Sequence, residues 1–254
     1  MTFGHVIFLF FAALIAGVQN SVAGGGTFFS FPALLFAGVP AIPANATSTV
    51  ALWPGTMASA AAYRKKLPHS ARILVPLVMA SLAGGFIGAS LLLKTPPATF
   101  MRLIPFLFLG ATLLFAFGKR LFKVSQPHKD AKASWLAIAG VALLQLPISI
   151  YGGFFGGGIG ILMLATLNFL RLPDIHAMNG VKTLLASATN AAAIITFVVA
   201  GIVVWPEALL MLVGAAAGGY AGAHYAQKVD PARVRTFIVI VGFAMSFYFL
   251  WKYR

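Results

Sequence analysis

Long apolar runs alternate with short polar connections along the whole chain, and this pattern predicts helices that cross a membrane. A helix needs roughly 20 mostly apolar residues to cross about 30 Å of hydrocarbon. The first run lacks a charged n-region and an A-x-A cleavage site, so we interpret it as a retained helix rather than a signal peptide. Eight runs bounded by charge, Pro or Gly are expected to span: Phe3–Gln19, Ala41–Tyr63, Ile73–Leu93, Phe100–Gly118, Ser134–Tyr151, His176–Ala200, Pro206–Ala226 and Val234–Trp251.

Two shorter apolar segments follow glycine triplets. GGGTFFSFPALLFAGVP begins at Gly24, and GGGIGILMLATLNFLRLP begins at Gly156. Their apolar parts, Thr27–Val39 and Ile159–Leu172, are too short to span. We interpret each as a half-helix that enters the membrane, stops and turns back. Bare backbone at membrane depth is tolerated only where protein buries it or where it lines a watery cavity, so these breaks imply a substrate cavity.

The two triplet segments belong to an internal repeat. Asn45 and Thr49 in NATST match Asn179 and Thr183 in NGVKT at one common offset. This match predicts two halves of about four helices each. Four crossings in each half would make the halves parallel, and an odd number in one half would make them inverted; the sequence leaves both open. The predicted division is a first transmembrane repeat over residues 1–118, a basic cytoplasmic linker over 119–133 and a second repeat over 134–254.

Composition supports a membrane chain. Hydrophobic residues make up 60% and charged residues 9%, against roughly 45–50% and about 25% in soluble proteins. The formal net charge of +14 would suggest nucleic acid in a polar protein, but here anionic lipid and the positive-inside bias explain it better. With zero Cys, disulfides, thiolate metal sites and thiol nucleophiles are excluded.

The basic connections indicate an orientation. One is the segment with Arg64, Lys65, Lys66 and Arg72; the other, within 119–133, holds five Lys and Arg residues. Both are expected to be cytoplasmic. Two predicted spans precede the first connection, so the N-terminus is also expected in the cytoplasm. The orientation of the second half stays open.

The glycine triplets are candidate anion sites. A helix N-terminus carries unpaired N–H groups and about half a positive charge, which suits an anion. Glycine has no side chain to block close approach to those donors. The alternative is that the glycines serve helix packing or a re-entrant turn. The candidate glycines are Gly24, Gly25, Gly26, Gly156, Gly157 and Gly158.

Lys182 is the sharpest single candidate. It lies inside a predicted span, and a cation within a membrane helix indicates a functional site by default. Facing a central cavity, it would pair with an anionic substrate. Alternatively, its stem snorkels to the interface. Its counterpart in the first repeat, Ser48, is neutral, so the expected site carries one fixed positive charge.

Further polar residues surround these positions in both repeats. Their amide and hydroxyl groups can donate to oxyanion oxygens, or can bond to their own helix or across helices. The candidates are Asn45, Ser48 and Thr49 with Asn179 and Thr183. All four acidic residues fall in predicted loops or at helix ends, and no histidines have ligand spacing. We therefore expect no metal, no cofactor and no enzyme activity.

At these motifs the chain resembles the TauE/SafE family of sulfite and organosulfur anion exporters, also called the 4-toluene sulfonate uptake permease family. The resemblance rests on Gly24–Gly38 with NATST and on GGGIG with NGVKT. It implies a secondary carrier of the prokaryotic or organellar membrane, driven by ion gradients, for sulfite, sulfoacetate or related organosulfonates. We expect an all-α protein of the bacterial inner membrane, with lipid and a second copy of the chain as further partners. The alternatives are a passive anion channel and a permease that imports a different small organic anion.

Overall fold

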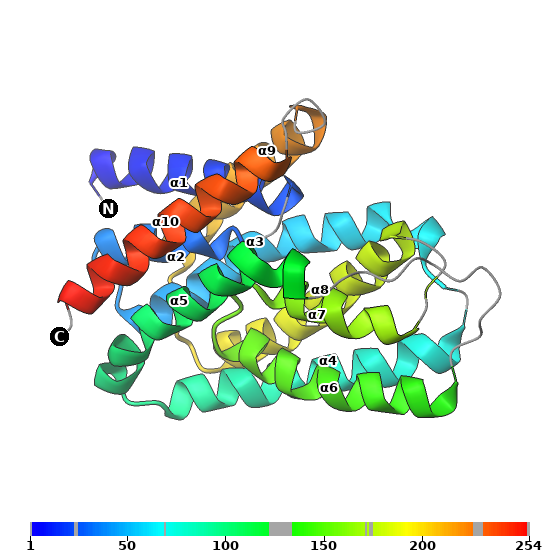
Figure 1. Ribbon diagram of the computed structural model, residues 1–254. Coiled ribbons are helices and arrows are strands. Elements are labelled where there is room, and N and C mark those ends of the chain that lie inside the picture. The colour runs from blue at the N-terminus through cyan, green and yellow to red at the C-terminus, as the bar shows by residue number, and fades with distance from the viewer. Residues whose placement is uncertain are drawn as a thin grey trace.

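The computed structural model describes residues 2–22, 25–68, 70–121, 134–170, 172, 175–225 and 231–252. These residues form helices and connecting turns, with no β-strand among them (Figure 1). The helices are α1 (Phe3–Val22), α2 (Thr27–Phe36), α3 (Ala41–Ala62), η1 (Arg64–Lys66), α4 (Ala71–Lys94), α5 (Pro97–Leu121), α6 (Trp135–Phe154), α7 (Ile159–Leu167), η2 (Asn168–Leu170), α8 (Ile175–Val199), α9 (Trp205–Tyr225) and α10 (Pro231–Lys252).

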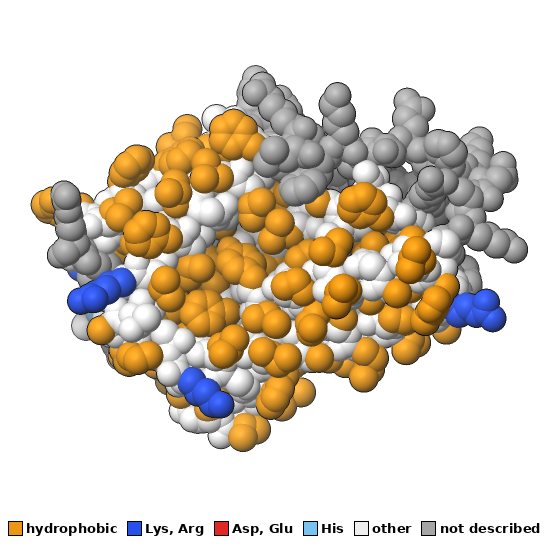
Figure 2. Space-filling view, turned by 60° about the horizontal axis from the view of Figure 1, so that its bottom comes forward, with side chains coloured by type: hydrophobic (Ala, Val, Ile, Leu, Met, Phe, Trp, Pro, Cys, Tyr) orange, Lys and Arg blue, Asp and Glu red, His pale blue; other side chains and the backbone are white. Residues whose placement is uncertain are grey.

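Eight long helices occupy the places where the apolar runs predict them, and two short helices, α2 and α7, follow the glycine triplets. Within the described ranges, five helices are long and apolar enough to cross a membrane: α1, α4, α5, α6 and α8. Large apolar side chains are exposed on the outer surface, and Figure 2 shows them over most of one face, with lysine and arginine only towards its edges. A surface of this kind is stable only in contact with hydrocarbon, so the chain is an integral membrane protein.

Glycine contacts show that two pairs of helices run parallel. On α4, Gly84 lies against Leu146 of α6, and Gly88 lies against Phe154, one to two turns further along both helices. On α9, Gly214 packs against Phe10 and Ala13 of α1, and Gly218 packs against Leu14. In each pair the residue numbers rise together, so α4 is parallel to α6 and α1 is parallel to α9.

Two other pairs run antiparallel. Trp53 of α3 donates from Nε1 to the Ser187 carbonyl of α8 at 3.1 Å, whereas Tyr63, at the end of α3, lies against Gly180 near the start of α8. The numbers rise on α3 as they fall on α8. The α5 and α10 helices behave in the same way: Thr112 faces Gly242, and the rings of Phe108 and Phe249 are 5.7 Å apart.

These directions correct the expected position of the N-terminus. The start of α3 lies at the α8–α9 connection, where the Val204 amide donates to Thr47 Oγ1 at 3.0 Å. Since α1 is parallel to α9, α1 also begins at that end, and Figure 1 places the N- and C-termini there together. The basic η1 segment follows α3 at the opposite end. The expectation that the N-terminus shares a side with the basic connections is therefore wrong, because α2 carries the chain back and α1 and α3 point the same way.

Candidate transport site at the two helix breaks

Both helix breaks lie against neighbouring turns of α5. In the first, Gly25 has φ +90° and lies against the ring of Phe115; in the second, Gly158 has φ +77° and lies against Ala111. Positive φ is accessible to glycine at little cost, which explains the residue type here. Ala111 and Phe115 are one turn apart on α5. The short helices α2 and α7 thus begin at a similar position along α5. Gly24 lies outside the described residues.

The N-terminus of α7 presents unused donors. The Gly158 carbonyl accepts the Ile161 amide at 3.1 Å, but across the described residues no acceptor faces the amides of Gly157, Gly158, Ile159 and Gly160. The Tyr151 hydroxyl donates to the Gly157 carbonyl at 2.7 Å and fixes the loop from the other side. Unpaired amides at the start of a helix are the geometry that binds anions.

The N-terminus of α2 differs, because the protein fills it. The Gly26 amide donates to Asn20 Oδ1 at 2.7 Å, and the Gly26 carbonyl accepts the Ser30 hydroxyl at 3.2 Å. A methyl group on Gly26 would meet Asn20 as well. Asn20 therefore occupies the place that an anion would take at this break.

Lys182 lies across the first turn of α7. Its Nζ donates to Asn179 Oδ1 at 3.0 Å, and its Cδ is 3.4 Å from where a Cβ on Gly160 would stand. Within the described ranges the ammonium has no carboxylate partner; the one acidic side chain there, Glu207, is at the start of α9. The lysine charge and the α7 dipole end are both positive, so an anion placed between them would stabilise both.

The remaining candidates form two groups rather than one cluster. Asn45 and Asn179 each lie eight residues before the contact of Trp53 with Ser187. Because α3 and α8 are antiparallel, the two asparagines lie on opposite sides of that contact, about 24 Å apart along the helices at 1.5 Å per residue. The first group, with Ser48, and the second, with Lys182, therefore lie at different depths.

Within the first group most donors are committed. Asn45 Nδ2 donates to the Phe154 carbonyl at the end of α6, at 3.2 Å, whereas its buried Oδ1 has no partner among the described residues. The hydroxyls of Ser48 and Ser30 are 2.6 Å apart. Thr49 donates to the Asn45 carbonyl of its own helix at 2.9 Å, and Thr183 bonds to its own helix in the same manner.

Aromatic rings fill the space between the breaks. The ring centroids of Phe31 and Phe155 are 5.9 Å apart, those of Phe108 and Phe155 5.5 Å, and those of Phe28 and Phe115 5.6 Å. All five side chains are buried. Edge-to-face contacts of this kind stabilise a closed interior.

Sequence reasoning missed a buried polar cluster between α4, α6 and α8. Gln145 Nε2 donates to the hydroxyls of Ser81 and Ser149, both at 2.9 Å, and Thr189 Oγ1 donates to Ser149 at 3.1 Å. All four side chains are fully buried. A single Gln in an apolar run was the available signal. The cluster joins three helices through side-chain hydrogen bonds, as polar residues do inside membranes.

The described residues form apolar exposed helices with two interrupted helices and a part-buried lysine, an arrangement typical of membrane transporters. Residues 9–249 match the model of the family described as Sulfite exporter TauE/SafE. The chain belongs to this family.

Curated relatives agree with that class. The chain is 28% identical to the "Probable membrane transporter protein ORF9" of Sinorhizobium sp over 97% of this chain and 92% of that protein. It is 27% identical to a "Probable membrane transporter protein" of Haemophilus influenzae, covering 94% and 91%. It is 29% identical to the "Probable membrane transporter protein YfcA" of Escherichia coli K12, covering 94% and 87%. No solved structure matches the chain.

Proposed function

We propose that this transporter is a secondary carrier that exports small sulfur-containing oxyanions, such as sulfite or an organosulfonate, across the cytoplasmic membrane. The observation that carries the proposal is Lys182 against the first turn of α7, where amides of Gly157–Gly160 lack a described acceptor. The family description, Sulfite exporter TauE/SafE, supports the sulfur oxyanion.

The energetics favour export. An inside-negative potential drives an anion outward by about 2.3 kcal/mol per charge per 100 mV. A carrier for a monovalent anion therefore needs no coupled cation to move it out. In the part of the chain that the structure describes, the single carboxylate is Glu207 in the first turn of α9, and none lies midway along a helix where it would bind Na⁺ or relay protons, which accords with potential-driven export.

The proposed substrate site consists of the amides at the start of α7 with Lys182 and Asn179. The proposed role of Asn45, Ser48 and Thr49 is a second, neutral position on the path, near the end of α6. Thr183 supports the fold of α8 through its backbone bonds. In this proposal Gly25 and Gly26 shape the first break, while Asn20 takes the place of the anion there.

We further propose that the two halves, 1–118 and 134–254, are inverted repeats that exchange access between the two sides. Support comes from the antiparallel pairing of α3 with α8 and of α5 with α10, which occupy equivalent places in the two halves. An inverted pair can rock about a fixed site and open it alternately to either side. The buried rings between the breaks oppose a continuous pore, which argues against a channel.

Transport of labelled sulfite in proteoliposomes tests the function. Lys182→Ala is expected to weaken substrate binding roughly 10- to 100-fold, because a charge-assisted hydrogen bond contributes about 1.5–3 kcal/mol. Lys182→Arg should retain part of the activity. Lys94→Ala is the matched control, because Lys94 is exposed at the end of α4.

Three results would overturn parts of the proposal. Transport by Lys182→Ala at the rate of the parent chain would remove the site. Saturable transport of carboxylates, with none of sulfite, thiosulfate or sulfonates, would remove the substrate class and leave a permease for another organic anion. Efflux that does not accelerate as the inside-negative potential is raised would contradict the direction.

A further inference from the structure

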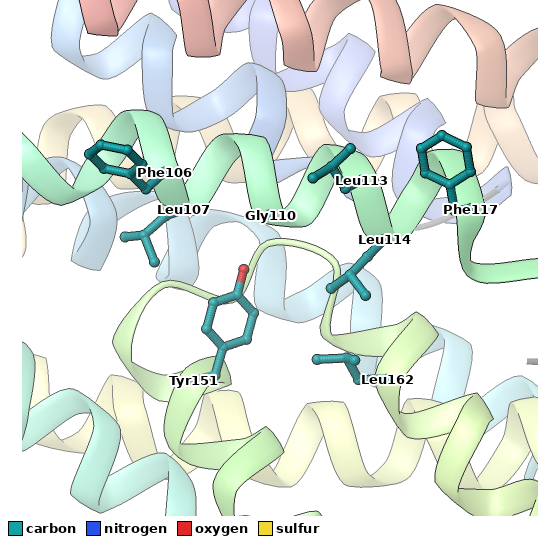
Figure 3. A pocket seen from close by; sticks show the side chains of 8 residues that line it. All are labelled: Phe106, Leu107, Gly110, Leu113, Leu114, Phe117, Tyr151 and Leu162. Atoms are coloured by element: carbon teal, nitrogen blue, oxygen red, sulfur yellow. The ribbon is translucent and has the colours of Figure 1, made fainter. Parts of the chain in front are cut away.

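A groove opens on the outer surface between α5 and the α6–α7 break. Its volume is about 700 Å³, and it is lined by Phe106, Leu107, Gly110, Leu113, Leu114, Phe117, Tyr151 and Leu162. Figure 3 shows six of these residues along α5, with Tyr151 and Leu162 approaching from the opposite wall. The groove is thus a gap between one long helix and the short helix α7.

The lining is apolar and faces the surrounding membrane. Phe106, Leu113 and Phe117 are among the exposed large side chains. The hydroxyl of Tyr151 is the polar group of the lining, and it already donates to the Gly157 carbonyl. Water would find almost no free hydrogen-bond partner in this groove, whereas a hydrocarbon chain can fill it without a desolvation cost.

The length of the groove and the positive charge near one end of it indicate which kind of hydrocarbon occupies it. From Phe106 to Phe117 the groove follows α5 for about 16 Å, roughly half of the 30 Å hydrocarbon core, a length that one acyl chain can fill. Arg102 is exposed one turn before Phe106 on the same face of α5. Its side chain extends towards the helix N-terminus and the interface, where a lipid phosphate lies.

We propose that this groove is a binding site for one phospholipid, whose acyl chain packs between α5 and α7 and whose phosphate pairs with Arg102. The acyl chain would lie against Leu162 of α7 and against Tyr151, whose hydroxyl donates to the glycine loop. The occupant thereby supports α7, the short helix whose first turn lies against Lys182.

Gly110 gives a clean test, because a Cβ placed on it meets nothing within 4 Å. Gly110→Phe should fill the groove without disturbing the helix. Gly140→Phe is the matched control: Gly140 lies on α6, is exposed, and also has free space around its Cβ. The readout is native mass spectrometry of the detergent-purified full chain, which counts retained phosphatidylglycerol and phosphatidylethanolamine.

The parent chain and Gly140→Phe are expected to retain one phospholipid, and Gly110→Phe is expected to lose at least 80% of it. Arg102→Gln should reduce retention several-fold with the groove intact. Equal retention by the two phenylalanine variants would overturn the proposal, as would a parent chain stripped of lipid under the same conditions. The measurement is independent of transport, so it stands apart from the proposed substrate.

Discussion

At the scale of single residues, some side chains of the candidate site can be predicted from the sequence and others cannot. Lys182 can be predicted because a lone cation in an apolar run needs an explanation. Asn20 can be singled out by its place just before the first glycine triplet, where its Oδ1 accepts the Gly26 amide. Tyr151 cannot, since it acts on loop atoms of the second break, where its hydroxyl donates to the Gly157 carbonyl. Those loop atoms come within reach only once the chain has reversed direction, which no local pattern encodes.

The close packing of Gly88 of α4 gives a prediction about stability. A methyl group on Gly88 would overlap the Ile150 carbonyl, whereas one on Gly140 would meet nothing. Gly88→Ala is therefore expected to destabilise the α4–α6 pair by about 1–3 kcal/mol through overpacking, and Gly140→Ala to be neutral or slightly stabilising. Thermal unfolding in detergent compares them; equal midpoints would contradict the close packing of α4 on α6.

At the scale of elements, periodicity and run length predict the helices well but miss how they reverse. The long helices begin and end within a few residues of the expected apolar runs, because hydrocarbon thickness sets their length. The predicted side of the N-terminus is wrong, because α1 and α3 run in the same direction and are not two successive crossings in opposite directions. The sequence contains a second repeat signal: Ala83–Ala89 and Ala217–Ala223 share the pattern AGG-x-x-GA. Gly84 and Gly88 of the first segment pack against α6, and Gly218 of the second packs against α1.

The loop of the α6–α7 break accepts a side-chain hydrogen bond from Tyr151, which yields an element-scale prediction. Tyr151→Phe keeps the ring in the groove but removes the hydroxyl that donates to Gly157. The expected loss is about 0.5–1.5 kcal/mol in the fixed loop conformation, seen as a several-fold weaker apparent affinity for sulfite with little change in thermal midpoint. Tyr220→Phe is the control, because Tyr220 is exposed. The same affinity in both variants would show that the loop needs no support from Tyr151.

At the scale of the whole molecule, the sequence leaves open whether the two halves are parallel or inverted. Only the packing of the helices shows in which direction each one runs. The predicted counts of crossings favoured neither parallel nor inverted halves, because the sequence does not say whether α2 and α7 add a crossing. The 23 Phe residues were likewise ambiguous between lipid contact and packing. The structure gathers Phe28, Phe31, Phe108, Phe115 and Phe155 between the breaks, where their rings pack against one another.

The orientation of the whole molecule can be measured directly, because the chain contains no cysteine. Single cysteines at Thr2, Ala200 and Lys65 probe the start of α1, the α8–α9 turn and the η1 segment, and all three positions are exposed. The helix directions put Thr2 and Ala200 at one end and Lys65 at the other. By the positive-inside rule the η1 end is cytoplasmic, so a membrane-impermeant maleimide should label Thr2→Cys and Ala200→Cys in intact cells, and Lys65→Cys only after permeabilisation. Labelling of Thr2→Cys together with Lys65→Cys would mean that α1 and α3 cross in opposite directions, and the inverted arrangement of the halves would fail with it.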